Sequence, residues 1–554
     1  MRIQIRSNAY WMPDAGEKKE RQISNFIVEG LYLIRSKDQP ARILTLKNEA
    51  GDSRTIKISS KDFASLHSFR AMSEGVGNFN WLGNGNDLQV VKEEIFARCD
   101  SVEEIIQLGW QAHSRVYAFS NGVFDGEKFS EIDPMGIVKT ANGSLLIPAF
   151  SEMYADSTRY EAQKKFRHTW RDISFGVWSQ RFLATFGPKG MIGISYLISC
   201  IFRDVIFNEL RFFPLLFLYG PPESGKSQFY FSFQKFFGLK QTVINLESGS
   251  TAVGSIRKLE QFVNSLVIFN EFKTTIDPRL IGLIKGVYDG DGRETGEYSN
   301  DSRTKQTKVS SGMIIAGQEL PTQESAMFTR LILLSFQKKP FSASEKETFD
   351  QLHDYEAENE GGLTTCLLEV LRHREVFERE FEGAYRNTFK EIKSEYSFSE
   401  SRQTSHAAIL LSVYKILGSI LALPFSYQEL KDEIILSTQD QIQYMTRSNE
   451  LSVFWESFDY LRNKNAIINE NHYSHKPDKN QLWIRLHIFY SEYMDFCNRT
   501  KKPALNEATL QNYLQNSPAY LTKTTVRFKE STHHALGFNL EKLKAEYQIE
   551  LEHI

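Results

Sequence analysis

The sequence FFPLLFLYGPPESGKSQFYFSFQKF occupies residues 212–236, and the rest of the chain is organised around it. An apolar run from Leu215 to Tyr219 stops at Gly220. A polar stretch with two glycines follows, and a second apolar-rich segment then continues to Gly238. This order predicts a buried strand, a phosphate-binding loop and a helix.

The loop and the start of the helix are the predicted nucleotide-binding residues: Gly220, Pro221, Pro222, Glu223, Ser224, Gly225, Lys226, Ser227 and Gln228. Such a loop wraps backbone N–H groups around a phosphate chain, and glycine lets the backbone come close. The helix that follows points its positive N-terminus at the same anion. We expect Lys226 to neutralise the outer phosphates of ATP and the Ser227 hydroxyl to bind Mg²⁺.

Length and composition limit the classes of protein. A chain of 554 residues, 41% of them hydrophobic, is long enough for two to four domains with buried cores. The net charge is -3, so a nucleic-acid partner would have to be bound by local basic patches. The four cysteines lie far apart, which argues against a zinc ribbon and a disulfide framework: Cys99, Cys200, Cys366 and Cys497.

Targeting and membrane signals are weak. The first residues, MRIQIRSNAYW, carry charge but no apolar segment typical of a signal peptide. Two apolar stretches, Met191–Phe202 and His406–Leu423, are too short or are interrupted by a charge. Both are predicted to be buried helices. We therefore expect a soluble, cytoplasmic protein that does not bind a membrane.

The pattern along the chain predicts four regions, with boundaries at 1–150, 151–340, 341–470 and 471–554. Alternating apolar and polar residues make the first region rich in β-strands. Strands that alternate with helices in the second predict a mostly parallel sheet covered on both faces. The third is predicted to be helical. A helix, a second helix and a terminal hairpin in the fourth predict a winged helix.

Several shorter segments carry predictions of their own. Alternation over Leu88–Ala97 predicts a strand, residues 472–480 a linker, and Leu482–Cys497 a helix. Asp277, followed by proline, and Asn506 are predicted N-caps of helices.

A carboxylate that activates water is expected at the tip of a strand near the loop. Glu271 fits, because it follows the apolar run Leu266–Phe269 and lies 45 residues after Lys226. We predict that it is the general base and, with Ser227, a ligand of Mg²⁺. Asn270 occupies the position that usually holds a magnesium-orienting Asp, and it carries no charge. The alternative for Glu271 is an ordinary loop carboxylate.

Two further polar residues lie at strand ends. Gln318 follows the strand Val309–Ala316 and is predicted to orient the attacking water or sense the γ-phosphate. Arg330 precedes the strand Leu331–Phe336, where an arginine can reach the γ-phosphate of a neighbouring subunit. The alternatives are a solvated turn residue for Gln318 and a surface cation for Arg330.

Residues 180–340 resemble an AAA+ ATPase of the superfamily 3 helicase type. The shared order is loop, acidic strand, Gly/Asp-rich segment, polar strand tip and arginine. The segment LIKGVYDGDGRETGEYSNDSRTKQTKVSSGMIIAGQELP lies where such helicases carry a β-hairpin that projects into the pore of a ring and grips DNA. The chain also resembles the primase–helicases of phages, plasmids and integrative elements, in which a stretch like Gly109-Trp110 to Asn121-Gly122 precedes the loop.

The resemblance implies an α/β fold: an AAA+ P-loop ATPase core, a β-rich N-terminal domain, and a helical and winged-helix C-terminal region. It implies an ATP-dependent DNA helicase that replicates a mobile genetic element as a ring, with a homo-hexamer and a separate primase as expected partners. Asn270 departs from the commonest pattern, which affects the metal geometry. The alternative is a nucleotide-dependent switch that assembles on DNA without unwinding it. A small-molecule kinase is disfavoured, since no acceptor pocket is evident.

Two groups of basic residues are candidates for DNA contacts. The first, predicted to bind single-stranded DNA in the pore, is Arg293, Arg303, Lys305 and Lys308. The second, predicted to bind duplex DNA from the C-terminal module, is Lys523, Arg527 and Lys529, with Lys501 and Lys502. The alternatives are a solvated charged loop for the first group, and a solvated face or a subunit contact for the second.

Overall fold

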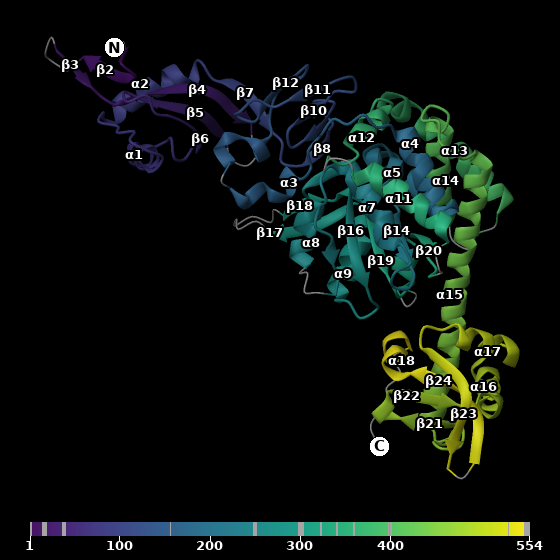
Figure 1. The fold of residues 1–554 in the computed structure, drawn as a ribbon. Coiled ribbons are helices and arrows are strands. Elements are labelled where there is room, and N and C mark those ends of the chain that lie inside the picture. The colour runs from purple at the N-terminus through teal and green to yellow at the C-terminus, as the bar shows by residue number, and fades with distance from the viewer. Residues whose placement is uncertain are drawn as a thin grey trace.

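The computed structural model describes residues 3–13, 19–35, 40–155, 157–247, 252–296, 304–321, 324–338, 342–357, 361–396, 398, 401–529 and 531–547. Figure 1 shows the β-rich N-terminal elements at one end of the molecule and an α/β body in the middle. A long helix leads from this body to a small C-terminal module.

The central body is built on a nine-stranded sheet with the order β11-β10-β9-β8-β16-β19-β14-β20, in which β15 also pairs with β16. Its strands are β8 (Leu108–Gln111), β9 (Val116–Phe119), β10 (Gly122–Phe124), β11 (Phe129–Glu131), β14 (Leu215–Tyr219), β15 (Ile244–Asn245), β16 (Phe262–Phe272), β19 (Ser310–Gly317) and β20 (Leu331–Ser335). The strands from β14 to β20 that pair with one another are parallel, and β8 to β11 form an antiparallel meander that joins at β16. The predicted domain boundary between residues 150 and 151 stays a prediction.

The sheet is covered on both faces, as a continuous apolar strand requires. On β14, Leu216 and Leu218 pack into one core, while Leu215 and Phe217 pack into the other. The first core includes side chains from α4 (Phe175–Phe186), α5 (Pro188–Ile201), α6 (Arg203–Leu210) and α7 (Lys226–Gln234). The second includes α9 (Pro278–Tyr288) and α10 (Ser325–Phe328), and α8 (Ala252–Leu259) contacts α9.

The apolar helix α5 lies in the first core. Its residues from Gly190 to Ile201 are all buried, which confirms the predicted buried helix over Met191–Phe202. In the described part of the chain, no single helix is long and apolar enough to cross a membrane. The pair α5 and α6 meets the length and composition criteria only when joined, and it is bent by 81°.

The N-terminal region contains two sheets and two helices. Its elements are β1 (Gln4–Arg6), β2 (Ala9–Pro13), β3 (Glu20–Gln22), β4 (Phe26–Arg35), β5 (Ala41–Asn48), β6 (Ser53–Ser59), α1 (Leu66–Gly75), α2 (Gly85–Phe96), β7 (Asp100–Glu104), β12 (Ile137–Thr140) and β13 (Gly143–Leu146). The predicted strand over Leu88–Ala97 is wrong, because α2 covers this segment. Asn84 and Asp87 form a capping box that starts the helix, and Leu88, Val91 and Ile95 bury one helical face.

The C-terminal half begins with helices: α11 (Ala343–Ala357), α12 (Thr364–Leu371), α13 (Arg374–Glu395), α14 (Ser401–Leu417) and α15 (Tyr427–Asn463). A four-stranded sheet follows, in the order β21-β22-β24-β23. The elements of this module are β21 (Tyr473–Lys476), β22 (Gln481–Ile484), α16 (Leu486–Thr500), α17 (Glu507–Gln515), β23 (Tyr520–Phe528), β24 (Ser531–Asn539) and α18 (Leu540–Tyr547).

Two predictions in this module are wrong in part. Residues 473–476 are a strand inside the predicted linker, and the predicted helix from Leu482 begins as strand β22. The reason is a distant partner. Trp483 pairs with Gly537, and a side chain at Gly537 would start 2.6 Å from the Trp483 ring. Residues 481–484 therefore form a strand because they pair with β24 of the terminal hairpin, although their local sequence pattern also suits a helix.

Candidate functional site

The loop predicted to bind phosphate connects the end of β14 to the start of α7. Its backbone turns through the left-handed region at Gly220 (φ +155°), Glu223 (φ +60°) and Gly225 (φ +94°). A Cβ at Gly220 would lie 2.3 Å from the carbonyl oxygen of Phe336, so only glycine fits there. The loop residues Pro221, Pro222 and Glu223 are exposed.

The Lys226 ammonium is folded into this loop. Nζ donates hydrogen bonds of 2.6 Å to the carbonyl oxygens of Gly220 and Pro221, and one of 3.2 Å to Oγ of Ser224. Burial lowers the pKa of Lys226, and the charge of Glu271 acts in the opposite direction. The loop thus places a partly desolvated cation where an anion can replace its backbone acceptors.

Neighbouring strands anchor both ends of the loop. The Gly220 N–H donates to the carbonyl oxygen of Gly317 at 3.2 Å, and the Phe336 N–H donates to that of Tyr219 at 2.6 Å. On the first turn of α7, Ser227 and Gln228 are exposed. Burial raises the pKa of Tyr230, and a hydrogen bond between its side chain and Ser227 acts against this. The Ser227 side chain is therefore exposed and has the Tyr230 side chain as a hydrogen-bond partner.

Glu271 lies near the end of β16 with a left-handed backbone (φ +59°). The Asn270 amide donates to Oε1 of Glu271 at 3.3 Å, and the Asn270 carbonyl accepts from the Leu246 N–H at 2.9 Å. Glu271 is close enough for its negative charge to raise the pKa of Lys226, against the effect of burial. The structure therefore brings Lys226, Ser227, Asn270 and Glu271 to one edge of the sheet.

The fit to Mg²⁺ depends on few protein ligands. Among the described residues, no three His, Cys, Asp or Glu side chains cluster as a metal site. Mg²⁺ at a nucleotide commonly uses one or two protein oxygens and takes the rest from phosphates and water. The Ser227 hydroxyl and the Glu271 carboxylate fit that donor set.

Gln318 follows β19, which lies between the loop strand β14 and the acidic strand β16. Its side chain is exposed at the same edge of the sheet as the loop. Its neighbour Glu319, which the sequence pattern did not single out, accepts from the Thr274 N–H (2.7 Å) and hydroxyl (2.8 Å). Glu319 thereby ties the chain beyond Glu271 to the chain around Gln318.

Arg330 lies at the opposite end of the sheet. The pairs Leu215↔Leu331 and Tyr219↔Ser335 show that β14 and β20 run in parallel, with Arg330 before the first pair and the loop after the last. At about 3.3 Å per residue, Arg330 is separated from its own loop by about 16 Å along the strands. The structure therefore does not bring Arg330 together with Lys226 and Glu271 of the same chain.

The Arg330 guanidinium has partners in its own chain. Nη2 pairs with Oδ2 of Asp289 at 3.1 Å, and Nη1 donates to the carbonyl of Ala326 at 2.7 Å. The guanidinium lies 5.3 Å from the centroid of the Tyr288 ring, and the side chain is 15% exposed. The Tyr288 hydroxyl in turn bonds Nε2 of His406 at 3.1 Å.

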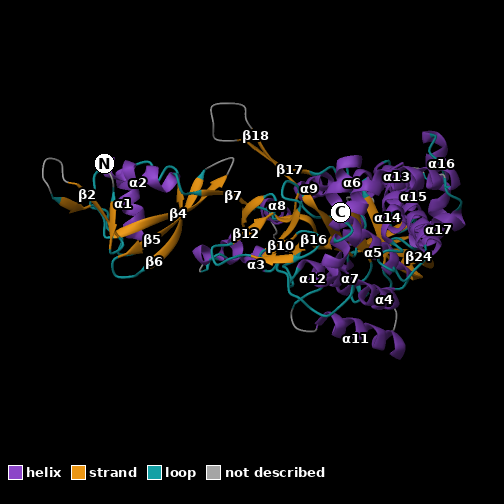
Figure 2. Ribbon diagram, turned by 90° about the horizontal axis from the view of Figure 1, so that it is seen from above, coloured by secondary structure: helices purple, strands orange, loops and turns teal. Residues whose placement is uncertain are grey.

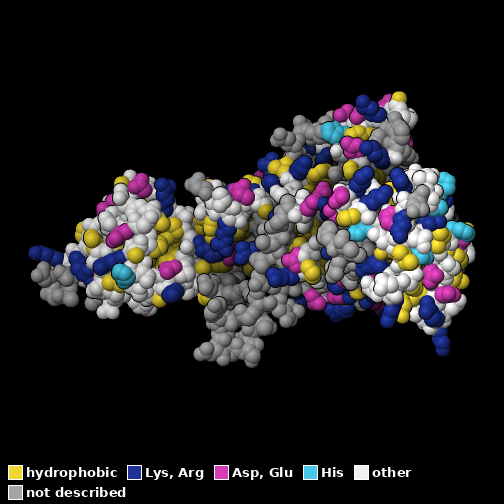
Figure 3. All heavy atoms as spheres, turned by 90° about the horizontal axis from the view of Figure 1, so that it is seen from below, with side chains coloured by type: hydrophobic (Ala, Val, Ile, Leu, Met, Phe, Trp, Pro, Cys, Tyr) yellow, Lys and Arg dark blue, Asp and Glu magenta, His cyan; other side chains and the backbone are white. Residues whose placement is uncertain are grey.

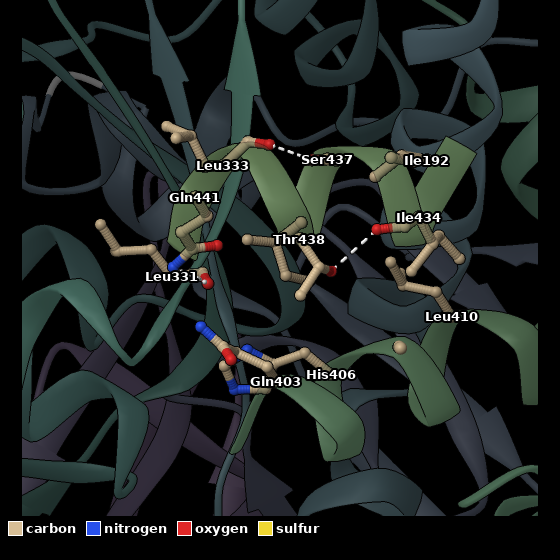
Figure 4. Close-up of a pocket in the computed structure, with 12 residues that line it drawn as sticks. Ile192, Leu331, Leu333, Gln403, His406, Leu410, Ile434, Ser437, Thr438 and Gln441 are labelled. Atoms are coloured by element: carbon tan, nitrogen blue, oxygen red, sulfur yellow. Dashed lines mark hydrogen bonds between the residues drawn. The ribbon is translucent and has the colours of Figure 1, made fainter. Parts of the chain in front are cut away.

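A small cavity of about 10 Å³ lies beside this cluster, between β20, α14 and α15. Figure 4 shows Gln403 and His406 along its lower edge, with Leu331 and Gln441 to their upper left. The Gln441 amide donates to the carbonyls of Phe328 (2.8 Å) and Leu331 (3.1 Å), whereas the buried Gln403 amide has no partner among the described residues. A cavity of this volume holds about one water molecule. It is no substrate pocket.

A hairpin follows α9 directly. Its strands are β17 (Asp291–Gly296) and β18 (Thr304–Lys308), with Thr295 opposite Lys305. Figure 2 shows this hairpin extending away from the central body. Arg293 and Lys305 lie in its strands, Lys308 is exposed at its base, and Arg303 lies outside the described residues.

The C-terminal cations lie on β23. Lys523 and Arg527 are exposed and four residues apart, which places them on one face of the strand. Lys523 donates to Oε1 of Gln511 at 3.1 Å, and Arg527 donates to the carbonyl of Lys529 at 3.4 Å. Lys502 forms an ion pair with Glu456. Figure 3 shows the basic side chains of one face scattered among acidic ones, in keeping with the net charge of -3.

No family model matches the chain, and no curated protein sequence matches it. Among solved structures, the fold is similar to that of the active helicase Cch of SCCmec type IV. The match covers 98% of this chain and 98% of that one, with a TM-score of 0.52 and 12% sequence identity. A JCV helicase structure with a bound small molecule matches 40% of this chain and 74% of its own, with a TM-score of 0.22 and 14% identity. The first match shows a mixed α/β fold shared over the whole length with a helicase.

Proposed function

We propose that this chain is an ATP-dependent DNA helicase with an AAA+ core of the superfamily 3 type, working as a ring oligomer in the replication of a mobile genetic element. The observation that carries the proposal is the division of the site between the two ends of the parallel strands in the central sheet. Lys226, Glu271 and Gln318 lie at the carboxyl ends of the strands, where a nucleotide binds. Arg330 lies at the other end, engaged with Asp289.

Chemistry in this proposal begins with the phosphates of ATP. Backbone N–H groups of the loop and the Lys226 ammonium bind them, replacing the carbonyl acceptors at Gly220 and Pro221. Glu271 accepts a proton from the attacking water, and the Gln318 amide orients that water. Ser227 and Glu271 would hold Mg²⁺, which supplies positive charge to the phosphates when bound.

Asn270 has a different role from the Asp expected at its position. Its amide donates to Oε1 of Glu271, so it orients the base without adding negative charge. We propose that metal binding depends more on Ser227 and the phosphates as a result. A less tightly held metal would slow hydrolysis, and this supports the second candidate function, a nucleotide-dependent switch that assembles on DNA without unwinding it.

DNA is proposed to contact two places on the chain. The hairpin residues Arg293, Lys305 and Lys308, with Arg303, would contact phosphates of a single strand in the pore. Lys523 and Arg527 on β23 of a winged helix would contact duplex DNA. A hexamer, a cytoplasmic location and a separate primase partner belong to the same proposal.

ATP hydrolysis measured with and without single-stranded DNA, together with displacement of a labelled strand from a forked duplex, tests the proposal. We expect DNA to stimulate hydrolysis and the labelled strand to be released only with ATP. The Lys226→Ala variant is the negative control, and it should neither hydrolyse ATP nor release the labelled strand. ATP-dependent DNA binding with no strand release would favour the switch, and no nucleotide binding at all would exclude both functions.

A further inference from the structure

We propose that Arg402, on helix α14, is a second residue that each subunit supplies to the nucleotide of its neighbour, beside Arg330. This inference rests on the proposed function and deepens it, because it adds a phosphate ligand from the helical region outside residues 180–340. The observation behind this inference is that the guanidinium groups of Arg330 and Arg402 both lie against the ring of Tyr288.

Both guanidiniums lie against Tyr288. That of Arg330 is 5.3 Å from the ring centroid, and that of Arg402 is 5.9 Å from it. Nη1 of Arg402 also donates to the hydroxyl of Thr329 at 3.1 Å, and Thr329 directly precedes Arg330. A residue of α14 is thereby fastened to the chain segment that positions Arg330.

The tyrosine is a rigid support. Tyr288 is 2% exposed, and its ring stacks on Phe212 with centroids 5.1 Å apart and planes 13° apart. Its hydroxyl bonds Nε2 of His406 at 3.1 Å. His406 and Arg402 are four residues apart on α14, so they lie on the same face of that helix. One face of α14 thus contacts Tyr288 at two points, and it places the Arg402 guanidinium against the same ring as that of Arg330.

The charges in this cluster do not balance. Among the described residues, Arg330 has one ion pair, with Asp289, and Arg402 has none. Two guanidiniums beside one carboxylate leave a net positive charge, which is stabilised by a further anion. Asp289 is 44% exposed, so the cluster opens to the surface.

The anion that fits this site comes from another chain. The cluster lies at the end of β20 away from its own phosphate loop, so its own nucleotide is out of reach. In a ring, the same edge of the molecule can meet the loop of the next subunit. The phosphate oxygens of ATP bound there provide several charged acceptors, which the planar, forked guanidinium groups of paired arginines can bind in bidentate fashion.

Steady-state ATPase kinetics of Arg402→Gln and Arg402→Lys test this role. Gln keeps a donor for the Thr329 hydroxyl but removes the charge, whereas Lys keeps the charge. We expect kcat of Arg402→Gln to fall about 100-fold, as when one preorganised donor is removed, with a KM within about threefold of the parent. Arg402→Lys should recover part of kcat. Arg379→Gln, an exposed arginine of α13, is the matched control and should remain fully active.

A mixing experiment separates action across the interface from a structural role. Arg402→Gln and Lys226→Ala proteins are combined, so that some interfaces join an intact loop to an intact Arg402. Recovered hydrolysis supports the proposal. If Arg402→Gln hydrolyses ATP at the parental rate, or if this mixture stays inactive while Arg330→Ala plus Lys226→Ala recovers, Arg402 has no such role and the proposed function stands. If Arg330→Ala alone is fully active, the ring arrangement itself fails.

Discussion

At the scale of single residues, backbone conformation and burial set the chemistry of the site. Glu271 has a left-handed backbone conformation, which is unfavourable for any residue with a Cβ. Its Oε1 accepts a hydrogen bond from the Asn270 side-chain amide. Strain of this kind is concentrated at functional positions in proteins. Lys226 is partly buried, and its pKa is lowered for that reason. In the function proposed above, both residues would already be held in place before a nucleotide binds.

Lys226→Ala and Glu271→Gln should separate binding from hydrolysis. We expect Lys226→Ala to lose ATP binding, because the loop then has no ammonium for the phosphates. Glu271→Gln should bind ATP normally and hydrolyse it about 100- to 1000-fold more slowly, since only proton acceptance is removed. Fluorescent-nucleotide titration and phosphate release measure the two steps. The matched control is Glu247→Gln, which changes an exposed glutamate that pairs with Lys273. Hydrolysis by Glu271→Gln at the parental rate would assign the base elsewhere.

His406 should make the folded protein sensitive to acid. Burial lowers its pKa to about 3, whereas an unfolded chain binds the proton near pH 6.5. The stability that neutral His406 contributes is present above pH 6.5 and is lost as the pH falls from 6.5 towards 3, by about 1.4 kcal/mol per pH unit. We expect the thermal midpoint to fall between pH 7 and pH 5, and His406→Gln to reduce that fall.

The control for this prediction is His67→Gln, which changes an exposed histidine of α1. It should leave the pH dependence of the thermal midpoint as it is in the parent protein. If His406→Gln and the parent lose the same number of degrees between pH 7 and pH 5, burial of His406 is not a source of the acid sensitivity.

At the scale of elements, the hairpin and the arginine cluster are consecutive in the chain. Tyr288 ends α9, Asp289 pairs with Arg330, and β17 begins at Asp291. The base of the hairpin is fixed by the Val309 N–H, which donates to the Gly290 carbonyl at 3.4 Å. Any change at the Arg330–Asp289 pair is therefore only two residues from the proposed DNA-binding strands.

Removing two hairpin cations should weaken binding to single-stranded DNA. For Lys305→Ala with Lys308→Ala we expect the slope of log K against log salt to fall by about two units, one for each lost phosphate contact. Nucleotide binding should be unchanged. Fluorescence anisotropy over a series of salt concentrations gives the slope. The matched control, Lys128→Ala with Lys139→Ala, changes two exposed lysines outside the hairpin, and an unchanged slope in the hairpin variant would remove it from the DNA path.

Local patterns account for the elements that were predicted correctly. The apolar run of β14 and the two glycines of its loop are read directly from adjacent residues. Asp277 and Asn506 cap their helices, as predicted, because a cap depends on its own side chain and the next few N–H groups. The apolar run Leu266–Phe269, predicted as a strand, forms the middle of β16, and the structure extends this strand at both ends to Phe262–Phe272.

Contacts between distant segments account for the rest. Arg402 reaches Thr329 across 73 residues, and no periodicity relates the two. Asp289 lies in a Gly/Asp-rich stretch that offers several acids, and only the fold selects it as the partner of Arg330. The meander of β8 to β11 joins the central sheet through β16, a pairing made about 150 residues away along the chain. Asn84 was the local signal for α2, and a search for capping boxes would have found it.

At the scale of the whole molecule, the division of the site predicts that activity requires assembly. Arg330→Ala should bind ATP but hydrolyse it at least about 1000-fold more slowly, because an arginine supplied by a neighbour stabilises the transferring phosphoryl group. Mixing Arg330→Ala with Lys226→Ala should restore hydrolysis at interfaces that join two intact halves. Mass measurements with ATP and DNA check the oligomer. Full activity in a monomer would contradict the prediction.

The long helix α15 is the last feature with a mechanical consequence. One part of it is bonded to β20, where Ser437 donates to the Leu333 carbonyl and Gln441 to that of Leu331. Its far part, from Leu451 to Leu461, belongs to the core of the C-terminal module. Thirty-seven residues of helix span about 55 Å. The far end of α15, at Asn463, lies about 33 to 39 Å beyond these two bonds, so a tilt of about 5° where the helix meets β20 displaces that end by about 3 Å. A small tilt of α15 at β20, the strand that begins beside Arg330, would therefore move the C-terminal module by a larger distance than it moves the helix at β20.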